Sequence, residues 1–99
     1  MMSKRFNKTF REVFSACKVA IKKCGFNIES FDEKEGYIYA SSPPSIFSWG
    51  EEINIELNKT PGGSIKVVVL SKPKAQLFDW GKSRENERKI IEALEEILE

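Results

Sequence analysis

The sequence predicts an α+β fold in which two helices bracket four strands, in the order α-β-β-β-β-α. Apolar residues recur with helical spacing near both ends of the chain, and they alternate with polar residues in the middle. The predicted strands follow one another through short, turn-rich connections, which favours antiparallel neighbours. We therefore expect residues 1–99 to form a single domain, a four-stranded antiparallel meander sheet with both helices on one face.

Residues 3–24 are predicted to form the first helix, with Ser3 or Asn7 as its N-cap and Gly25 at its end. Its apolar residues keep helical spacing and are Phe6, Phe10, Val13, Phe14, Cys17, Ala20, Ile21 and Cys24. Its polar face is basic and carries Lys4, Arg5, Lys8, Arg11, Lys18, Lys22 and Lys23. This face is either simply solvated or a binding surface for anionic lipid or nucleic acid.

Two short strands, residues 26–32 and 37–41, are predicted to pair through a turn that ends at Gly36. In the expected register Ile28 faces Ala40. The core face of this hairpin then carries Phe26, Ile28, Ile38 and Ala40. The opposite face carries three aromatic residues, Phe31, Tyr37 and Tyr39.

The hairpin over residues 49–71 decides which face of the sheet is the core. Apolar and polar residues alternate from Ile53 to Asn58, and residues 65–70 are rich in β-branched side chains. The register that keeps the aliphatic side chains together pairs Leu57 with Ile65, and it places Glu51 opposite Ser71.

Residues 83–98 are predicted to form the second helix, with Asp79 or Ser83 as its N-cap. Its apolar stripe is Ile90, Ile91, Leu94, Ile97 and Leu98. Its polar face is rich in glutamate, so we expect it to lie beside the basic first helix with complementary charge.

Composition excludes several classes of protein. The chain has 99 residues and a net charge of +1, without the basic excess of a dedicated nucleic-acid-binding protein. No apolar run approaches the length of a membrane span, about 18 residues, and no signal-peptide core is evident. We therefore expect a soluble, cytoplasmic protein that does not use nucleic acid as its main partner.

Neither a metal nor a cofactor is expected. The chain has no histidine, and Cys17 and Cys24 stand seven residues apart on the predicted first helix. That spacing separates them by about 10 Å along the axis, too far for a disulfide, and it does not match a zinc site. Catalytic and phosphate-binding motifs are absent from the sequence, so we assign no catalytic residue and do not expect an enzyme.

The sheet face away from the helices is the first candidate site. It would gather Phe31, Tyr37, Tyr39, Val68 and Leu70. A monomer rarely leaves a large contiguous apolar patch in water. We therefore expect a protein partner or a second copy of the chain, forming a homodimer, to bind here. The alternatives are scattered aromatics without a role and stacking of single-stranded RNA.

A polar corner, where the central hairpin meets the start of the second helix, is the second candidate site. It would gather Trp49, Glu51, Ser71, Asp79, Trp80, Lys82, Ser83 and Asn86. Glu51 would accept hydrogen bonds from the first amides of the helix or pair with Lys82. The structural interpretation is a capping network that docks the helix. The alternative is a small-molecule or minor enzymatic site.

Several of these residues also form spaced motifs. They are Gly25-Phe26, Gly36 to Ala40, Ser48-Trp-Gly-Glu51, Ser71 with Pro73, Gln76, Asp79-Trp-Gly-Lys82 and Asn86. Over residues 10–98 the chain resembles a family of small bacterial domains with paired SWGE and DWGK motifs. The resemblance implies no established activity and carries over no catalytic residue. Ser83 stands where the family pattern has a further asparagine.

Overall fold

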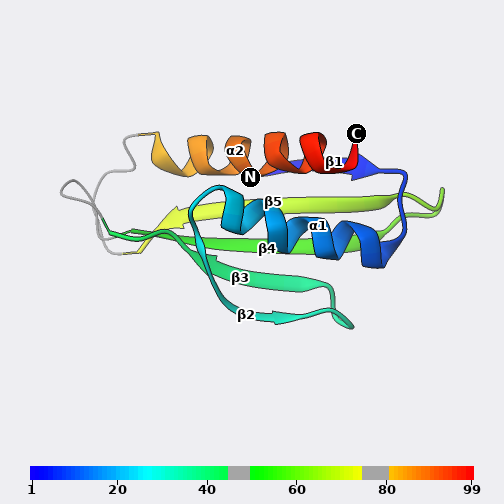
Figure 1. Cartoon of the computed structure of the whole chain (residues 1–99), viewed down its shortest axis with the longest axis horizontal. Helices are drawn as coiled ribbons and strands as arrows, with labels where there is room; N and C mark the ends of the chain where they lie inside the picture. The colour runs from blue at the N-terminus through cyan, green and yellow to red at the C-terminus, as the bar shows by residue number, and fades with distance from the viewer. Residues whose placement is uncertain (45–49, 75–80) are drawn as a thin grey trace.

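The computed structural model describes residues 1–44, 50–74 and 81–99, and in this part of the chain two helices lie on one face of a five-stranded antiparallel sheet (Figure 1). The helices are α1 (Phe10–Lys23) and α2 (Lys82–Leu98). The strands are β1 (Met2–Phe6), β2 (Asn27–Asp32), β3 (Tyr37–Ser41), β4 (Glu51–Lys59) and β5 (Ile65–Pro73), in the spatial order β1-β5-β4-β3-β2. The predicted α+β class and the meander from β2 to β5 are confirmed. The predicted number of four strands is wrong.

The additional strand, β1, occupies residues that were predicted to begin the first helix. It pairs antiparallel with the outer edge of β5, with Met2 opposite Val69 and Phe6 opposite Ile65. Phe6 is buried in the core, while the residues before it alternate between partly buried and exposed. The helix predicted over residues 3–24 is therefore wrong before residue 10, because residues 3–6 pair as a strand and residues 7–9 connect it to α1.

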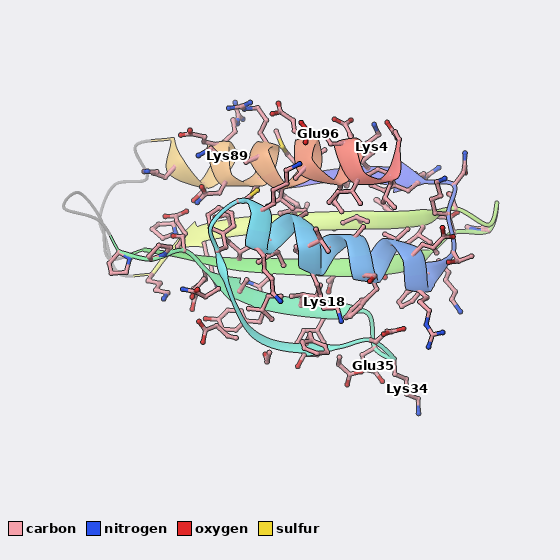
Figure 2. The ribbon with its side chains drawn as sticks, in the orientation of Figure 1. Lys4, Lys18, Lys34, Glu35, Lys89 and Glu96 are labelled. Carbon is pink, nitrogen blue, oxygen red and sulfur yellow. The ribbon has the colours of Figure 1, made fainter. Side chains whose placement is uncertain are left out.

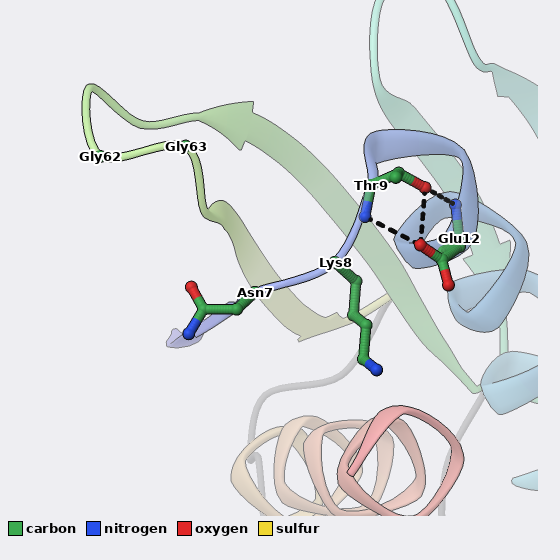
Figure 3. A pocket seen from close by; sticks show the side chains of 6 residues that line it. All are labelled: Asn7, Lys8, Thr9, Glu12, Gly62 and Gly63. Atoms are coloured by element: carbon green, nitrogen blue, oxygen red, sulfur yellow. Dashed lines mark hydrogen bonds between the residues drawn. The ribbon is translucent and has the colours of Figure 1, made fainter.

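Helix α1 begins at a capping box rather than at Ser3 or Asn7 (Figure 3). The Glu12 N–H donates to Thr9 Oγ1 over 3.1 Å, and the Thr9 N–H donates to Glu12 Oε1 over 3.1 Å. Two of the first amides without a partner inside the helix are satisfied in this way. The hydrogen bond from the Thr9 backbone also holds the pKa of Glu12 below its ordinary value.

The end of α1 has the hydrogen bonds of a Schellman motif around Gly25, as the glycine predicted. The Phe26 N–H donates to the Ile21 carbonyl over 3.0 Å, and the Gly25 N–H donates to the Lys22 carbonyl over 2.9 Å. Gly25 has a φ of +83°, which is accessible to glycine at little cost. Phe26 is thereby turned into the core, where it is buried.

The pairing of β4 with β5 is offset by two residues from the predicted register. Leu57 lies opposite Val67 instead of Ile65, and Glu51 lies opposite Pro73 instead of Ser71. Because side chains alternate with a period of two, this offset leaves every residue on its predicted face. The core residues Ile53, Ile55, Leu57, Ile65, Val67 and Val69 are all buried.

A β-bulge between Ile28 and Ser30 changes the predicted facing of β2. Ile28 pairs with Ala40 as predicted, but Ser30 then pairs with Tyr39, and Phe31 pairs with Ile38. Phe31 therefore lies on the face that the helices cover. Its ring contacts that of Phe14 on α1, with centroids 6.1 Å apart. The Lys18 ammonium lies 4.7 Å from the Phe31 ring centroid, and Figure 2 shows Lys18 reaching from α1 toward this hairpin.

The two helices lie side by side and oppositely charged side chains pair between them, as predicted. Lys23 on α1 pairs with Glu96 on α2 over 2.7 Å, which lowers the pKa of Glu96. Lys4 on β1 pairs with Glu95 and with Glu99, the latter over 3.2 Å. However, Lys4 and Arg5 belong to β1 and Lys8 to the connection, so the single basic helix face is wrong.

Both cysteines are free thiols on α1 or at its end, and the prediction that they do not pair is confirmed. Cys17 is buried in the core, and burial raises the pKa of its thiol to about 12. Cys24 is only partly buried, and burial raises its pKa less far. In the described residues, no helix is both long and apolar enough to cross a membrane.

Candidate functional site

The face of the sheet that no described helix covers carries four of the five residues predicted there. Tyr37 and Tyr39 point outward from β3, and Val68 and Leu70 point outward from β5. β4 runs between them, so Tyr37 and Val68 lie on either side of Glu56. The prediction is wrong for Phe31, the fifth residue, because the bulge in β2 turns its side chain toward α1.

A groove of about 360 Å³ runs over β4 on this face. We call it the outer groove. Tyr37 lines one side, and Met1, Val68 and Leu70 line the other. Tyr37 is 40% exposed and Leu70 39%, so the walls of the groove leave apolar surface in contact with water.

Charges on the outer face are divided between its two sides. The acidic side, on β2 and β4, carries Asp32, Glu52 and Glu56. The basic side, on β1 and β5, carries Arg5, Lys66 and Lys72. The two sides meet where Lys72 pairs with Glu52 over 3.7 Å. Glu52 also accepts a hydrogen bond from the Tyr39 hydroxyl over 3.1 Å, which raises the pKa of Tyr39.

The polar corner is built around Glu51, the first residue of β4, which is only 1% exposed. Its Oε1 accepts hydrogen bonds from Ser71 Oγ over 3.0 Å and from Ser83 Oγ over 2.6 Å. The backbone N–H of Glu51 donates to Ser42 Oγ over 2.8 Å. The carboxylate thus joins β4, β5 and the first turn of α2. The predicted capping of α2 is wrong, because the helix has no side-chain cap and Glu51 contacts it through the Ser83 hydroxyl.

The second carboxylate oxygen of Glu51 is different. Within the described ranges no donor lies within hydrogen-bond distance of Oε2, although this atom is buried. Glu51 also lines a pocket of about 190 Å³ between β4 and the ends of both helices. We call it the corner pocket. It is further lined by Cys24, Lys82, Asn86 and Lys89.

Glu87 is a buried residue of this corner that sequence reasoning missed. Its Oε2 accepts a hydrogen bond from the Ser71 N–H over 2.8 Å, and its Oε1 lies 2.9 Å from the Met1 ammonium. The ladder between β1 and β5 ends at Val69, and Glu87 supplies an acceptor for the next free amide of β5. Ser83 and Glu87 continue the spacing of the apolar stripe, i, i+4 and i+7 to Ile90, and this signal could have identified them.

The structure therefore brings together Glu51, Ser71, Lys82 and Asn86 of the predicted corner. The direct cross-strand pairing of Glu51 with Ser71 is wrong, because these residues are two positions out of register and bond diagonally. The N-cap of α2 is Gly81, not Ser83, whose side chain bonds Glu51 instead. Three further predicted residues, Trp49, Asp79 and Trp80, lie outside the described residues.

Two other features of the described residues are weaker candidates for a functional site. A wide, shallow hollow of about 510 Å³ lies between the start of α1 and the turn at Gly62 and Gly63 (Figure 3). The hydroxyl and carboxylate beside it already bond each other in the capping box. In residues 1–44, 50–74 and 81–99, no three acidic or sulfur-bearing side chains gather where they could hold a metal ion.

Comparison with known proteins found no family whose model matches the chain and no curated protein that is similar to it.

Proposed function

We propose that the protein is a non-enzymatic association module that forms a homodimer through the outer face of its sheet. The observation that carries this proposal is the outer groove, with its partly exposed apolar walls. One face of the sheet packs on the helices, and the other presents Tyr37, Val68 and Leu70 to water. Covering such a face removes apolar surface from water, which favours association.

The division of charge on the outer face favours a second copy of the chain as the partner. A two-fold axis that runs along the strands, between β4 and β5, lays the basic side of each copy over the acidic side of the other. Lys72 of one copy then lies opposite Glu52 of the other. An isologous interface needs a self-complementary surface of this kind.

The size of the face indicates a weak, concentration-dependent dimer. Strands are spaced about 4.8 Å apart, and a nine-residue strand extends about 30 Å, so the outer face offers on the order of 600 Å². A standard interface uses about 800 Å² from each partner. We therefore expect reversible association that weakens as salt rises, because the charged sides contribute to it.

Sedimentation velocity and light scattering over a concentration series test the proposal. The wild-type mass should rise from the monomer value of 11.3 kDa toward twice that value. Leu70→Glu and Tyr37→Glu place a charge in the groove wall and should keep the protein monomeric. Val19→Glu is the matched control, because Val19 is an exposed apolar residue, 52% accessible, on α1.

The folded state of each variant is checked by circular dichroism before its mass is interpreted. A wild-type protein that stays monomeric at the highest concentrations contradicts the homodimer. So does a Leu70→Glu variant that dimerises as well as Val19→Glu, because the outer groove then plays no part in association.

A further inference from the structure

The corner pocket contains polar and charged groups that are not needed to hold α2 against β4. The hydroxyls of Ser71 and Ser83 both donate to Glu51 Oε1. Its Oε2 lies buried with no donor among the described residues, and buried polar atoms are normally hydrogen-bonded. Among the described residues the carboxylate therefore lacks one hydrogen-bond donor, and Glu51 itself lines a pocket of about 190 Å³.

Cationic groups line the same pocket. Lys82 stands at the first position of α2, and Lys89 lies two turns further along the same helix. The Lys89 ammonium is partly exposed and lies 3.5 Å from Glu85. A ligand here would therefore meet groups of both charges, the buried carboxylate of Glu51 and the side chains of Lys82 and Lys89. Asn86 lines the same pocket.

The volume limits the size of the ligand. Water takes about 30 Å³ in the liquid, so the pocket holds a molecule of only a few non-hydrogen atoms. Pockets for drug-sized ligands start at about 300 Å³. The ligand must supply a hydrogen-bond donor for Glu51 and an anionic group for the lysines within this small volume.

We infer that the corner pocket binds a small α-amino acid, with its ammonium group on Glu51 Oε2 and its carboxylate toward Lys82 and Lys89. Both charged groups of the ligand then meet the opposite charge in the pocket. This site is separate from the outer face, because Glu51 points to the side of the sheet on which the helices lie. Binding at the corner pocket and dimerisation can therefore succeed or fail independently.

Alkylation of Cys24 with iodoacetamide reports occupancy of the pocket. Cys24 lines it, whereas Cys17 is buried in the core and reacts only after unfolding. Glycine, L-alanine, L-serine, L-threonine and L-aspartate are tested one at a time. At least one should slow the alkylation and should bind in isothermal titration calorimetry. Ethylamine and propionate, each lacking one charged group of alanine, should protect far less.

Substitutions assign the effect to the pocket. Glu51→Gln should weaken binding about tenfold or more, because the charge-assisted hydrogen bond is lost. Lys89→Gln lies on the exposed rim and should weaken binding about threefold without affecting folding. Lys34→Gln, in the turn between β2 and β3, is the matched control and should bind as the wild type does; Figure 2 shows Lys34 far from Lys89.

Three outcomes would overturn the inference. One is that none of the amino acids binds, which leaves Glu51 Oε2 to water. Another is that an amino acid binds but Lys89→Gln and Glu51→Gln bind it as tightly as the wild type. The third is that ethylamine or propionate protects Cys24 as well as alanine does, because recognition then involves only one of the two charged groups.

Discussion

Gly36 and Gly63 both have positive φ angles, +76° and +89°, but their surroundings differ. A Cβ added at Gly36 would lie 2.8 Å from the Leu57 carbonyl oxygen and 3.0 Å from the Phe10 ring. A Cβ added at Gly63 would meet no atom within 4 Å. Gly36 also donates a hydrogen bond to Asp32 and accepts one from Leu57, so its backbone has little freedom to move away.

Gly36→Ala should therefore destabilise the fold more than Gly63→Ala does. Both pay for a left-handed conformation, about 1–2 kcal/mol, and Gly36→Ala adds about 1–3 kcal/mol of steric overlap. Urea denaturation of the two variants measures the difference directly. Equal losses of stability would mean that the close approach of Gly36 to β4 relaxes without cost.

The elements show what alternation and periodicity can predict and what they leave open. The offset between β4 and β5 was beyond prediction, because a two-residue slip keeps Ile55 and Leu57 on the core face. The bulge in β2 was equally hidden, since nothing in the sequence around Glu29 interrupts the pattern. The first error arises because the hydrophobic pattern fixes a face but not a partner, and the second because a bulge changes the face of the residues that follow it.

The start of α1 could have been predicted from its capping box, but the helical spacing of the apolar residues favoured an earlier start. Phe6 and Phe10 stand four apart, which suits one helix face, yet Phe6 also ends an alternating strand. Thr9 and Glu12 form the sequence of a capping box, which marks residue 9 as the boundary. At the polar corner the sequence grouped Glu51 with Lys82 and Asn86 correctly. Only the structure reveals that a buried oxygen of Glu51 has no donor among the described residues.

Removal of the capping box should weaken α1 in a pH-dependent way. Thr9→Ala should cost about 1 kcal/mol of unfolding free energy, whereas Ser15→Ala, on the exposed face of α1, should change it by less than about 0.5 kcal/mol.

The folded pKa of Glu12 is lowered from 4.5, so the stabilisation by its carboxylate is present above that value and is lost as pH falls through the folded pKa. Urea denaturation at several pH values should show wild type and Glu12→Gln converging in acid. A constant difference would contradict this origin.

On the scale of the whole molecule, β1 joins the ends of the chain to one core. It covers the edge of β5, inserts Phe6 beneath the helices and pairs Lys4 with Glu95 of α2 and with Glu99 at the end of that helix. α2 in turn packs on β1, β5 and α1. The first and last elements therefore stabilise each other, and neither half of the chain buries its apolar face alone.

Phe6→Ala and Phe31→Ala test this arrangement as a pair, because both substitutions truncate a phenylalanine but in different surroundings. Phe6 is 2% exposed and its loss leaves a cavity between β1 and the helices, so it should cost about 3–5 kcal/mol. Phe31 is 52% exposed and contacts Phe14 only from the rim, so its loss should cost about 1 kcal/mol. Since a domain is stable by about 5–15 kcal/mol, Phe6→Ala should lower the urea midpoint steeply while unfolding stays cooperative. A loss no greater than that of Phe31→Ala would show that β1 is dispensable to the core.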